Sequence, residues 1–335
     1  MELFLRGRVH AMSTLTIVMY HYIRDLANSR YPGIKGLTIE AFEGQLDYVT
    51  KRYEVCSMRD IVDAVHGRRA LPDHACALTF DDGFLDHFTV VFPRLVARRL
   101  TASFYPPVTA IAQRTVLETH QIHLILAVAG DDAAALARRV RALIDARGDA
   151  DLPPAAALYA THAVASRFDG PDVTFVKRVL QKGLPPRVRG DIIRQLFDEY
   201  VGIDPRVVAR ELYMDLDQLR CMVQHGMEVG GHGAEHVWLD TLSREGQERE
   251  IARTVDFLDE VYGERPRDWV MCYPFGAHDA TTLDVVGAAG CVVGLTTRVG
   301  VARDLAQPLT LPRLDTNDLP RRGDASPAAL EAQRG

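Results

Sequence analysis

The chain has 335 residues, 47% of them hydrophobic, so it can bury a large core as one α/β domain or as two smaller domains. Its formal net charge of −6 argues against a nucleic-acid-binding surface over the whole molecule, although it does not exclude a local basic patch. No segment approaches the roughly 20 apolar residues of a membrane-spanning helix, so we expect no integral membrane segment.

Cysteine usage and the N-terminal region favour a reducing compartment. The five cysteines are scattered and include no CxxC pair, which is typical of buried, reduced thiols. Arg6 and Arg8 are not followed by the apolar segment of a secretion signal, and the short apolar run 15–20 is typical of a strand. We therefore expect a cytoplasmic protein with a ragged N-terminal extension and a disordered tail over 319–335.

Short apolar runs alternate with segments of helical periodicity. The predicted strands span 15–20, 75–80, 102–105, 227–230, 269–273, 292–296 and 309–311. Helices are predicted at 39–52, 89–99, 243–262 and 280–290, with Ser243 as an N-cap. Because nearly continuous apolar strands alternate with helices, we predict an α/β fold with a parallel sheet covered by helices. About seven strands suit an incomplete β/α barrel, whose chemistry lies at the strand ends.

The alternation is interrupted between residues 113 and 214. This region has almost no strand signal, and its helical patterns, separated by Gly- and Pro-rich breakers, lie at 131–146, 154–167, 173–181 and 187–200. We interpret 113–214 as a helical insertion that divides the predicted barrel into 13–112 and 215–318. The insertion either covers one edge of the active site or only adds stability, and the sequence does not distinguish these roles.

Two adjacent carboxylates, Asp81 and Asp82, follow the apolar run 75–78 in the segment Thr79–Gly83. Successive side chains of a strand point to opposite faces, but a sharp turn through Gly83 could bring both into one cavity. One carboxylate could then bind a metal ion while the other accepts a proton from water. For this segment taken alone, an Asp-Gly turn without function is the common alternative.

Two imidazoles stand four residues apart in the segment His232–His236, after a predicted strand and two glycines. If 232–236 begin a helical turn, both side chains share one face and could bind one ion. Glu235 directly precedes the second histidine, so this is not the HExxH pattern of zinc proteases. Two imidazoles and one carboxylate make a three-ligand site with open positions, which suits zinc and also cobalt, nickel or iron.

A third segment, Tyr273–Gly276, turns the chain with a proline and a glycine at the end of the predicted strand 269–273. A backbone N–H in this turn could bind the oxyanion of a tetrahedral intermediate. A β-turn with aromatic packing is the alternative.

The segments Thr79–Gly83, His232–His236 and Tyr273–Gly276 resemble, in this order, the signature segments of the polysaccharide deacetylases related to the NodB domain (carbohydrate esterase family 4). Flanking segments are also similar to this family, namely 18–21 to its first strand, 42–46 to its first helix and 101–105 to the strand after the first motif. The resemblance covers roughly residues 14–110 and 215–315, so the helical middle of the chain lies outside it.

This resemblance implies a distorted (β/α)7 barrel that hydrolyses an N- or O-acetyl group of a sugar. It implies that Asp81 is the general base, that Asp82, His232 and His236 bind the metal, and that the Tyr273 backbone N–H binds the oxyanion. The cofactor would be a divalent metal, zinc with cobalt or nickel as alternatives, and a metal-bound water would be the nucleophile.

One family feature has no counterpart in this chain. The late Leu-x-His segment, which supplies the general acid, is absent, and residues 311–318 stand in its place. Arg313 in this segment could orient the base carboxylate by a bidentate contact. For the acid we prefer His21, because it follows the first predicted strand, and His120 or His123 are the alternatives.

These residues, read with the family resemblance, predict a metal-dependent carbohydrate deacetylase, a hydrolase of non-peptide C–N bonds. Because a cytoplasmic location is expected, the substrate would be an acetylated monosaccharide, a nucleotide sugar or a lipid-linked sugar. Two alternatives remain, an amidase of the allantoinase type and a non-catalytic sugar-binding protein. The presence of both Asp81 and Asp82 argues against the second, because a binding protein needs no base.

Overall fold

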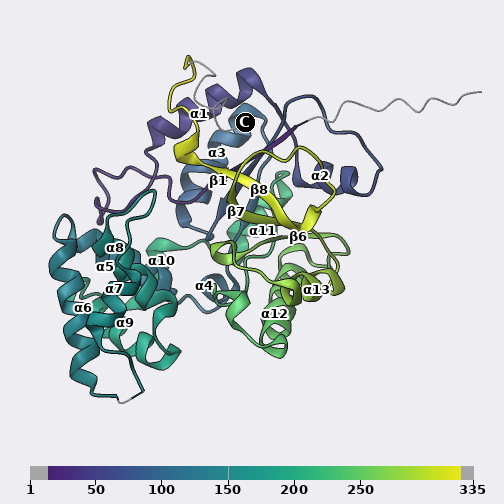
Figure 1. Cartoon of the computed structure of the whole chain (residues 1–335). Helices are drawn as coiled ribbons and strands as arrows, with labels where there is room; N and C mark the ends of the chain where they lie inside the picture. Colours follow the sequence, from purple (N-terminus) through teal and green to yellow (C-terminus); the bar gives the residue numbers. More distant parts are fainter. Residues whose placement is uncertain (1–13, 150, 326–335) are drawn as a thin grey trace, which may run out of the picture.

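A parallel sheet forms the centre of the computed structural model, which describes residues 14–149 and 151–325 (Figure 1). Its strands are β1 (Leu15–Tyr20), β2 (Glu54–Val55), β3 (Ala75–Asp81), β4 (Ser103–Tyr105), β5 (Glu228–Val229), β6 (Trp269–Cys272), β7 (Cys291–Val299) and β8 (Leu311–Asp315). They pair in the order β5-β4-β3-β1-β8-β7-β6, and the short β2 pairs with β3 outside this path. All of these pairings are parallel, which confirms the predicted α/β class.

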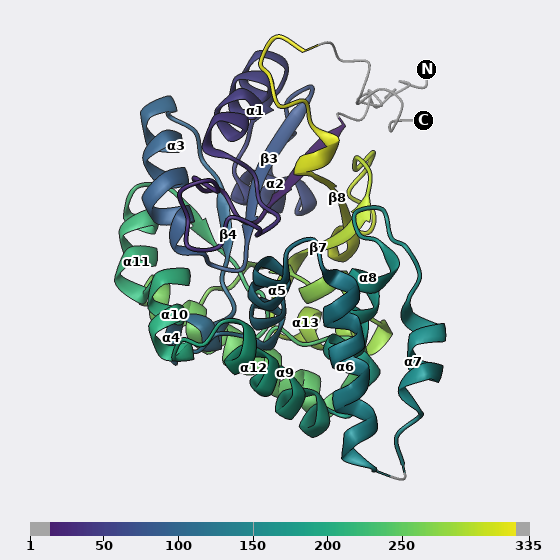
Figure 2. The ribbon, with the colours of Figure 1, turned by 90° about the vertical axis from the view of Figure 1, so that its left-hand side faces the viewer.

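Helices surround this sheet and also form a separate group beside it. Their bounds are α1 (Ile39–Arg52), α2 (Met58–Val65), α3 (Phe92–Arg98), α4 (Val108–Ala112), α5 (Glu118–Ala129), α6 (Ala133–Arg147), α7 (Ala155–His162), α8 (Pro171–Arg178), α9 (Pro186–Tyr200), α10 (Pro205–Leu212), α11 (Leu216–Gln224), α12 (Arg244–Tyr262) and α13 (Ala280–Ala288). Figures 1 and 2 show α1, α3, α11 and α12 around the sheet and α5–α9 gathered at one side. Ser243 caps α12 as predicted, because its side chain accepts from the Gly246 N–H.

The sheet curls until its two edges meet. Beyond β5, Gly231 donates its N–H to Val270 O (2.9 Å) and accepts from the Cys272 N–H (2.8 Å), in a parallel bridge to β6. Glycine permits this approach, because a Cβ at residue 231 would lie 2.5 Å from Cγ2 of Thr254. This is the distorted barrel that the sequence predicted, and it brings the C-terminal ends of the strands together.

One local prediction was wrong, and one condition considered for the second motif was not met. The predicted strand 309–311 is mostly the 3₁₀ turn Pro308–Thr310, and β8 begins at Leu311, where pairing with β7 starts. Residues 232–236 form a loop and not a helical turn, because Gly233 and His236 both have positive φ angles, of 71° and 53°.

Between β4 and β5 the described residues form helices and no strand. Ion pairs join this helical part to other segments. Asp169, between α7 and α8, accepts hydrogen bonds from Lys177 of α8 (2.7 Å) and from Lys35 of the loop before α1 (2.6 Å). Arg167 pairs with the buried Asp318 after β8. The limits that we assigned to the insertion and to the two barrel parts stay a prediction.

Residues 319–325 lie alongside α1 in the folded chain. The side chains of Arg52 and Lys51 donate to the backbone oxygens of Ala325 (2.6 Å) and Gly323 (3.4 Å). The predicted N-terminal extension and the predicted disorder over 326–335 lie outside the described residues. None of the helices in 14–149 and 151–325 has the length and apolar character needed to cross a membrane.

Candidate active site

The predicted site residues gather where the parallel strands end. Asp81 is the last residue of β3, and His21 directly follows β1. His232 directly follows the Gly231 bridge at the end of β5, and Arg313 lies in β8, beside β1 in the sheet. Segments that are far apart in the sequence therefore meet at one end of the barrel, where barrel enzymes place their chemistry.

Asp81 and Arg313 form a buried ion pair. Nη1 of Arg313 donates to Oδ1 of Asp81 (2.9 Å) and Nη2 donates to Oδ2 (2.8 Å), while its Nε donates to Thr296 O (2.9 Å). Burial raises the pKa of Asp81, but the Arg313 guanidinium outweighs this effect and holds the pKa at about 2. The carboxylate is therefore ionised at neutral pH and has a fixed orientation.

His21 lies on the solvent side of this pair. Its Nε2 is 3.8 Å from Oδ2 of Asp81, and its side chain is 40% exposed, so it can exchange protons with water. The other two candidates for the acid contact other groups. His123 contacts the Tyr22 hydroxyl at 3.3 Å, and His120 contacts Asp82.

Asp82 presents one carboxylate oxygen to both histidines of the second motif. Its Oδ1 lies 3.4 Å from Nε2 of His232 and 3.3 Å from Nε2 of His236, and all three side chains are buried. Burial raises the pKa of Asp82, but the imidazoles around it outweigh this effect and hold its pKa well below the usual range. Burial lowers the pKa of His236 to about 4, so its ring is neutral and offers a lone pair.

This group of three fits a divalent metal ion. Nδ1 of His232 lies 2.7 Å from the carbonyl oxygen of Cys272, so Nδ1 carries a proton and Nε2, toward Asp82, is the nitrogen available to a metal. Burial lowers the pKa of His232, but Cys272 and Asp82 outweigh this effect and raise the pKa well above its usual range, so a metal ion would displace a proton from Nε2. Oδ1 of Asp82 is buried, and no group among the described residues donates a hydrogen bond to it, so a cation there would satisfy it. One carboxylate and two imidazoles with ligand atoms within 4.8 Å of one another are typical of catalytic zinc sites.

A second group of possible ligands, Asp81, His232 and Cys272, lies beside the first. Both Asp81 oxygens already accept hydrogen bonds from Arg313. Burial raises the pKa of the Cys272 thiol, which disfavours the thiolate that a metal needs. The second group therefore offers no uncommitted anionic ligand, and the first is the better metal site.

The predicted role of the Tyr273 backbone N–H is contradicted by its hydrogen bond. This N–H donates to Leu295 O (3.1 Å), in the pairing of β6 with β7, so it is not free to bind an oxyanion. The Tyr273 ring is buried and stacks on His278, with 5.1 Å between the ring centroids. Residue type and position along the chain do not reveal which amides the sheet uses, and this caused the error.

A neighbouring amide of the same turn is free. Pro274 has no N–H, and the Gly276 N–H donates to Tyr273 O (2.8 Å). In the part of the chain that the structure describes, the Phe275 N–H has no hydrogen-bond acceptor. Phe275 has a positive φ of 59°, and its ring meets His236 edge-on, with 4.6 Å between the centroids. The turn that borders the metal-ligand group thus contains a free donor.

Glu250 of α12 holds the loop that contains the two histidines. Its Oε2 accepts hydrogen bonds from the N–H groups of Ala234 (2.8 Å) and Glu235 (3.0 Å). Burial raises the pKa of Glu250, although these two donors oppose the shift. The sequence pattern around Glu250 predicted only a helix, so no signal in the sequence pointed to this role.

His120 of α5 is a further residue at the site. It is fully buried, and its Nε2 lies 3.2 Å from Oδ2 of Asp82, the carboxylate oxygen that faces away from His232 and His236. The sequence suggested His120 only as an alternative proton donor, and nothing in its spacing indicated contact with Asp82.

Comparisons with known sequences agree with this geometry. Residues 195–294 match the family model of the polysaccharide deacetylases. The protein YxkH of Bacillus subtilis (strain 168), named as a polysaccharide deacetylase, is 25% identical over 95 residues, which are 28% of this chain. The match spans 33% of the length of that curated relative.

Solved structures share the fold over nearly the whole chain. The Streptococcus pyogenes deacetylase PplD, in complex with acetate, has a TM-score of 0.56 at 18% identity, with 97% of this chain and 99% of that chain covered. For IcaB from Ammonifex degensii the TM-score is 0.52 at 17% identity, with 95% and 94% covered. For the BpsB deacetylase domain from Bordetella bronchiseptica it is 0.51 at 17% identity, with 90% and 95% covered.

The family match and the shared fold are consistent with each other. The matched residues 195–294 include the segments of His232, His236 and Tyr273. The barrel agrees with the NodB-type fold that the resemblance implied. Residues 195–294 thus match the polysaccharide deacetylase family, and nearly the whole chain shares the fold of solved deacetylases.

Proposed function

We propose that this protein is a metal-dependent carbohydrate deacetylase that removes an acetyl group from an N- or O-acetylated sugar. The observation that carries the proposal is the buried group of Asp82, His232 and His236 directly beside the ionised Asp81. The names of its relatives, which are deacetylases, support the reaction class. A hydrolase needs both parts of this arrangement, a cation and a base that the cation does not occupy.

Asp82, His232 and His236 would hold the metal, which would lower the pKa of water and polarise the acetyl carbonyl. The donor set suits zinc, with cobalt or nickel as alternatives. Neutral His236 offers a nitrogen lone pair toward Asp82, whereas the raised pKa of His232 keeps a proton on its ring in the metal-free protein. A metal ion bound there would therefore displace a proton from His232 but none from His236.

Asp81 is proposed as the general base. Arg313 occupies one lone pair on each of its oxygens and leaves the other lone pairs free to accept a proton. With a pKa of about 2, the carboxylate is a weak base that is always ionised near neutral pH. The driving force for proton transfer must therefore come from an acidified water, which makes the base and the metal interdependent.

His21 is proposed as the proton donor to the leaving group. It lies 3.8 Å from Asp81 and is partly exposed, so it can take up a proton from solvent and deliver it beside the base. The Phe275 N–H replaces the Tyr273 N–H as the proposed donor to the oxyanion, because it is the free amide of the turn that packs against His236.

The substrate class follows from the proposed reaction and the expected location. We keep the acetylated monosaccharide, nucleotide sugar or lipid-linked sugar as candidate substrates, and the cytoplasmic location stays a prediction. Hydrolysis of a cyclic amide by the same residues remains the second candidate, because the proposed chemistry does not depend on the sugar.

Acetate release from a panel of N-acetylated sugars, nucleotide sugars and chitooligosaccharides tests the proposal, with cyclic amides assayed in parallel. The purified protein is assayed with and without chelator, and zinc, cobalt or nickel is then restored. We expect chelator-sensitive acetate release that Asp82→Asn abolishes and that the exposed control Asp198→Asn leaves unchanged. His21→Gln should reduce turnover by about 10²- to 10⁴-fold.

Each contrary result has a distinct meaning. Turnover of cyclic amides alone would replace the deacetylase proposal with the amidase. No turnover by protein that binds metal would favour a non-catalytic sugar-binding protein. Near-normal turnover by His21→Gln would exclude His21 as the proton donor, and full activity of Asp82→Asn would overturn the metal site.

A further inference from the structure

We propose that the helical part between β4 and β5 positions the metal ligand Asp82 through His120 and Tyr213, which lie near its beginning and its end. This inference rests on the proposed metal site and assigns a role to a helical part of which residues 106–194 lie outside the match to the family model. It concerns this chain's own contacts around Asp82 and not the identity of the substrate.

His120 contacts the carboxylate oxygen of Asp82 that the other histidines leave free. His232 and His236 face Oδ1, whereas Nε2 of His120 lies 3.2 Å from Oδ2. Among the described residues, the group of mutually close ligand atoms contains Asp82, His232 and His236 but not His120. His120 is therefore a positioning residue that acts on the ligand carboxylate from the side opposite to the two other imidazoles.

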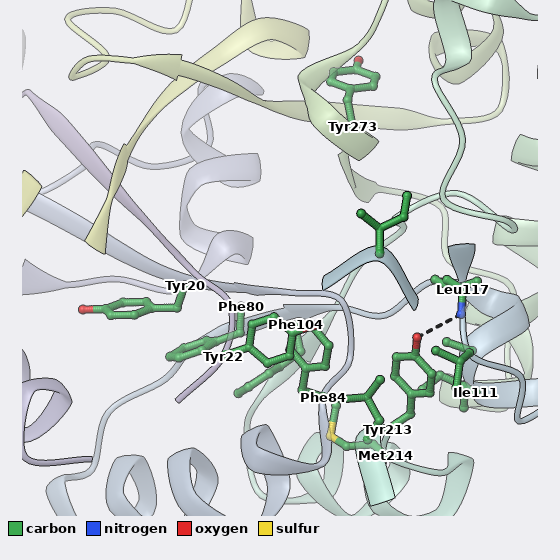
Figure 3. Close-up of a cluster of buried hydrophobic side chains, with 14 of the residues drawn as sticks. Tyr20, Tyr22, Phe80, Phe84, Phe104, Ile111, Leu117, Tyr213, Met214 and Tyr273 are labelled. Carbon is green, nitrogen blue, oxygen red and sulfur yellow. Dashed lines mark hydrogen bonds between the residues drawn. The ribbon is translucent and has the colours of Figure 1, made fainter. Parts of the chain in front are cut away.

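Tyr213 determines which ring nitrogen of His120 carries the proton. The Tyr213 hydroxyl oxygen accepts the Leu117 N–H (3.2 Å), the hydrogen bond drawn in Figure 3. The same hydroxyl lies 2.5 Å from Nδ1 of His120, and its own proton can be donated to that nitrogen. Nε2 of His120 then carries the proton and lies 3.2 Å from the negatively charged Asp82, an electrostatic contact whose angle falls outside hydrogen-bond geometry.

The same helical part also holds the backbone of the Asp82 turn. Asp82 has a positive φ of 77°, an uncommon conformation that needs support from its surroundings. After the helical part, Tyr213 forms an antiparallel bridge to Phe84, and the Met214 N–H donates to Gly83 O (3.0 Å). The rings of Phe84 and Tyr213 lie nearly parallel, 6.2 Å apart, and Figure 3 shows both beside Met214.

Side chain and backbone of Asp82 are thus both restrained by residues at the two ends of the helical part. Without His120, the carboxylate could rotate away from the imidazoles, and metal binding would have to restore its orientation. Residues that orient a metal ligand in this way typically change metal affinity by about 10- to 100-fold.

Zinc affinity, measured by competition with a chromophoric chelator, tests the inference without any substrate. His120→Leu removes the contact with Asp82 but keeps an apolar side chain in the buried position, and we expect zinc affinity to fall by about 10- to 100-fold. His120→Gln keeps an N–H donor and should recover part of the loss. Tyr213→Phe should also weaken binding, whereas the matched control Tyr159→Phe, whose hydroxyl contacts Asp172 inside the helical part, should not.

Thermal unfolding of the metal-free variants separates positioning from folding. A lower affinity of His120→Leu with a melting temperature like that of the unaltered protein supports positioning, as does rescue by His120→Gln. Equal zinc affinity of His120→Leu and the unaltered protein would overturn this inference but leave the proposed metal site in place. A failure of the unaltered protein to bind zinc, cobalt or nickel would overturn the proposed metal site and this inference with it.

Discussion

At the scale of single residues, the buried pair of Asp81 and Arg313 costs desolvation free energy but keeps the proposed base ionised and oriented. Burying two charges costs free energy, and their mutual attraction with further hydrogen bonds must offset that cost. Nε of Arg313 donates to Thr296 O, and Nη1 also donates to the Thr79 hydroxyl, so all three guanidinium nitrogens form hydrogen bonds. The arrangement suits a carboxylate that has to stay ionised and in place inside a barrel.

Arg313→Met should leave the Asp81 carboxylate buried without its partner and lower the free energy of unfolding by about 3–5 kcal/mol. Urea unfolding at neutral pH measures this change. The double variant Asp81→Asn with Arg313→Met should recover much of the loss, because it removes the unpaired charge as well. Full stability of the single variant would show that the pair is not a determinant of folding.

The same pair predicts a pH dependence with a defined sign. The folded pKa of Asp81, about 2, lies below its ordinary value of 3.8, so the unfolded chain binds this proton more readily. The stability from the pair is therefore present above about pH 4 and is lost as the pH falls toward about 2. The difference in unfolding free energy between the unaltered protein and the double variant should shrink over that interval, and a constant difference would contradict the assignment.

At the scale of elements, ion pairs of Asp169 connect the helical part to the loop before α1. Burial raises the pKa of Asp169, but Lys177 and Lys35 outweigh this effect and lower it. Lys35 is 67% exposed, so solvent screens its share of the interaction. The connection therefore orients the helices more than it stabilises the fold.

Asp169→Asn should lower the free energy of unfolding by roughly 1 kcal/mol or less at low ionic strength, and added salt should reduce this effect. Urea unfolding at two salt concentrations measures it. Asp198→Asn, the same chemical change at an exposed position of α9, is the matched control and should have little effect. An effect of Asp169→Asn that did not depend on salt would point to a packing role for this side chain.

At the scale of the whole molecule, the proposed metal-ligand group joins parts of the barrel that are distant in the sequence. Asp82 follows β3, whereas His232 and His236 follow β5, beyond the helical part. A ligand that binds all three only in the folded state stabilises that state by mass action. Folding and metal binding should therefore be coupled.

Zinc should raise the melting temperature of the protein, and at a concentration about 100 times the dissociation constant the stabilisation would be about 2.7 kcal/mol. Thermal unfolding with added zinc and then with excess chelator measures it. Asp82→Asn should abolish the shift, whereas Asp198→Asn should retain it. An equal shift in Asp82→Asn would place the bound zinc at another site.

Much of the fold could be predicted because buried parallel strands are nearly continuous apolar runs. The strand at 15–20 was predicted with its observed bounds. The strand β3 was predicted at 75–80, which omits only its last residue, Asp81. β2 was not predicted, since its two residues form a strand only by pairing with β3. A helical turn at 232–236 was considered only as a condition, because glycine conformations cannot be read from spacing. The structure has a loop there, and its two histidines converge on Asp82 without a helical turn.

The sequence by itself determined the parallel α/β barrel and the chemical types at the strand ends, because apolar periodicity and the carboxylate and imidazole groups are local properties of the chain. Only the tertiary structure decided that Arg313 occupies both oxygens of Asp81, that His120 reaches Asp82, and that the sheet uses the Tyr273 N–H. Each of these depends on a partner brought close by strand pairing and barrel closure, and sequence spacing carries no information about that partner.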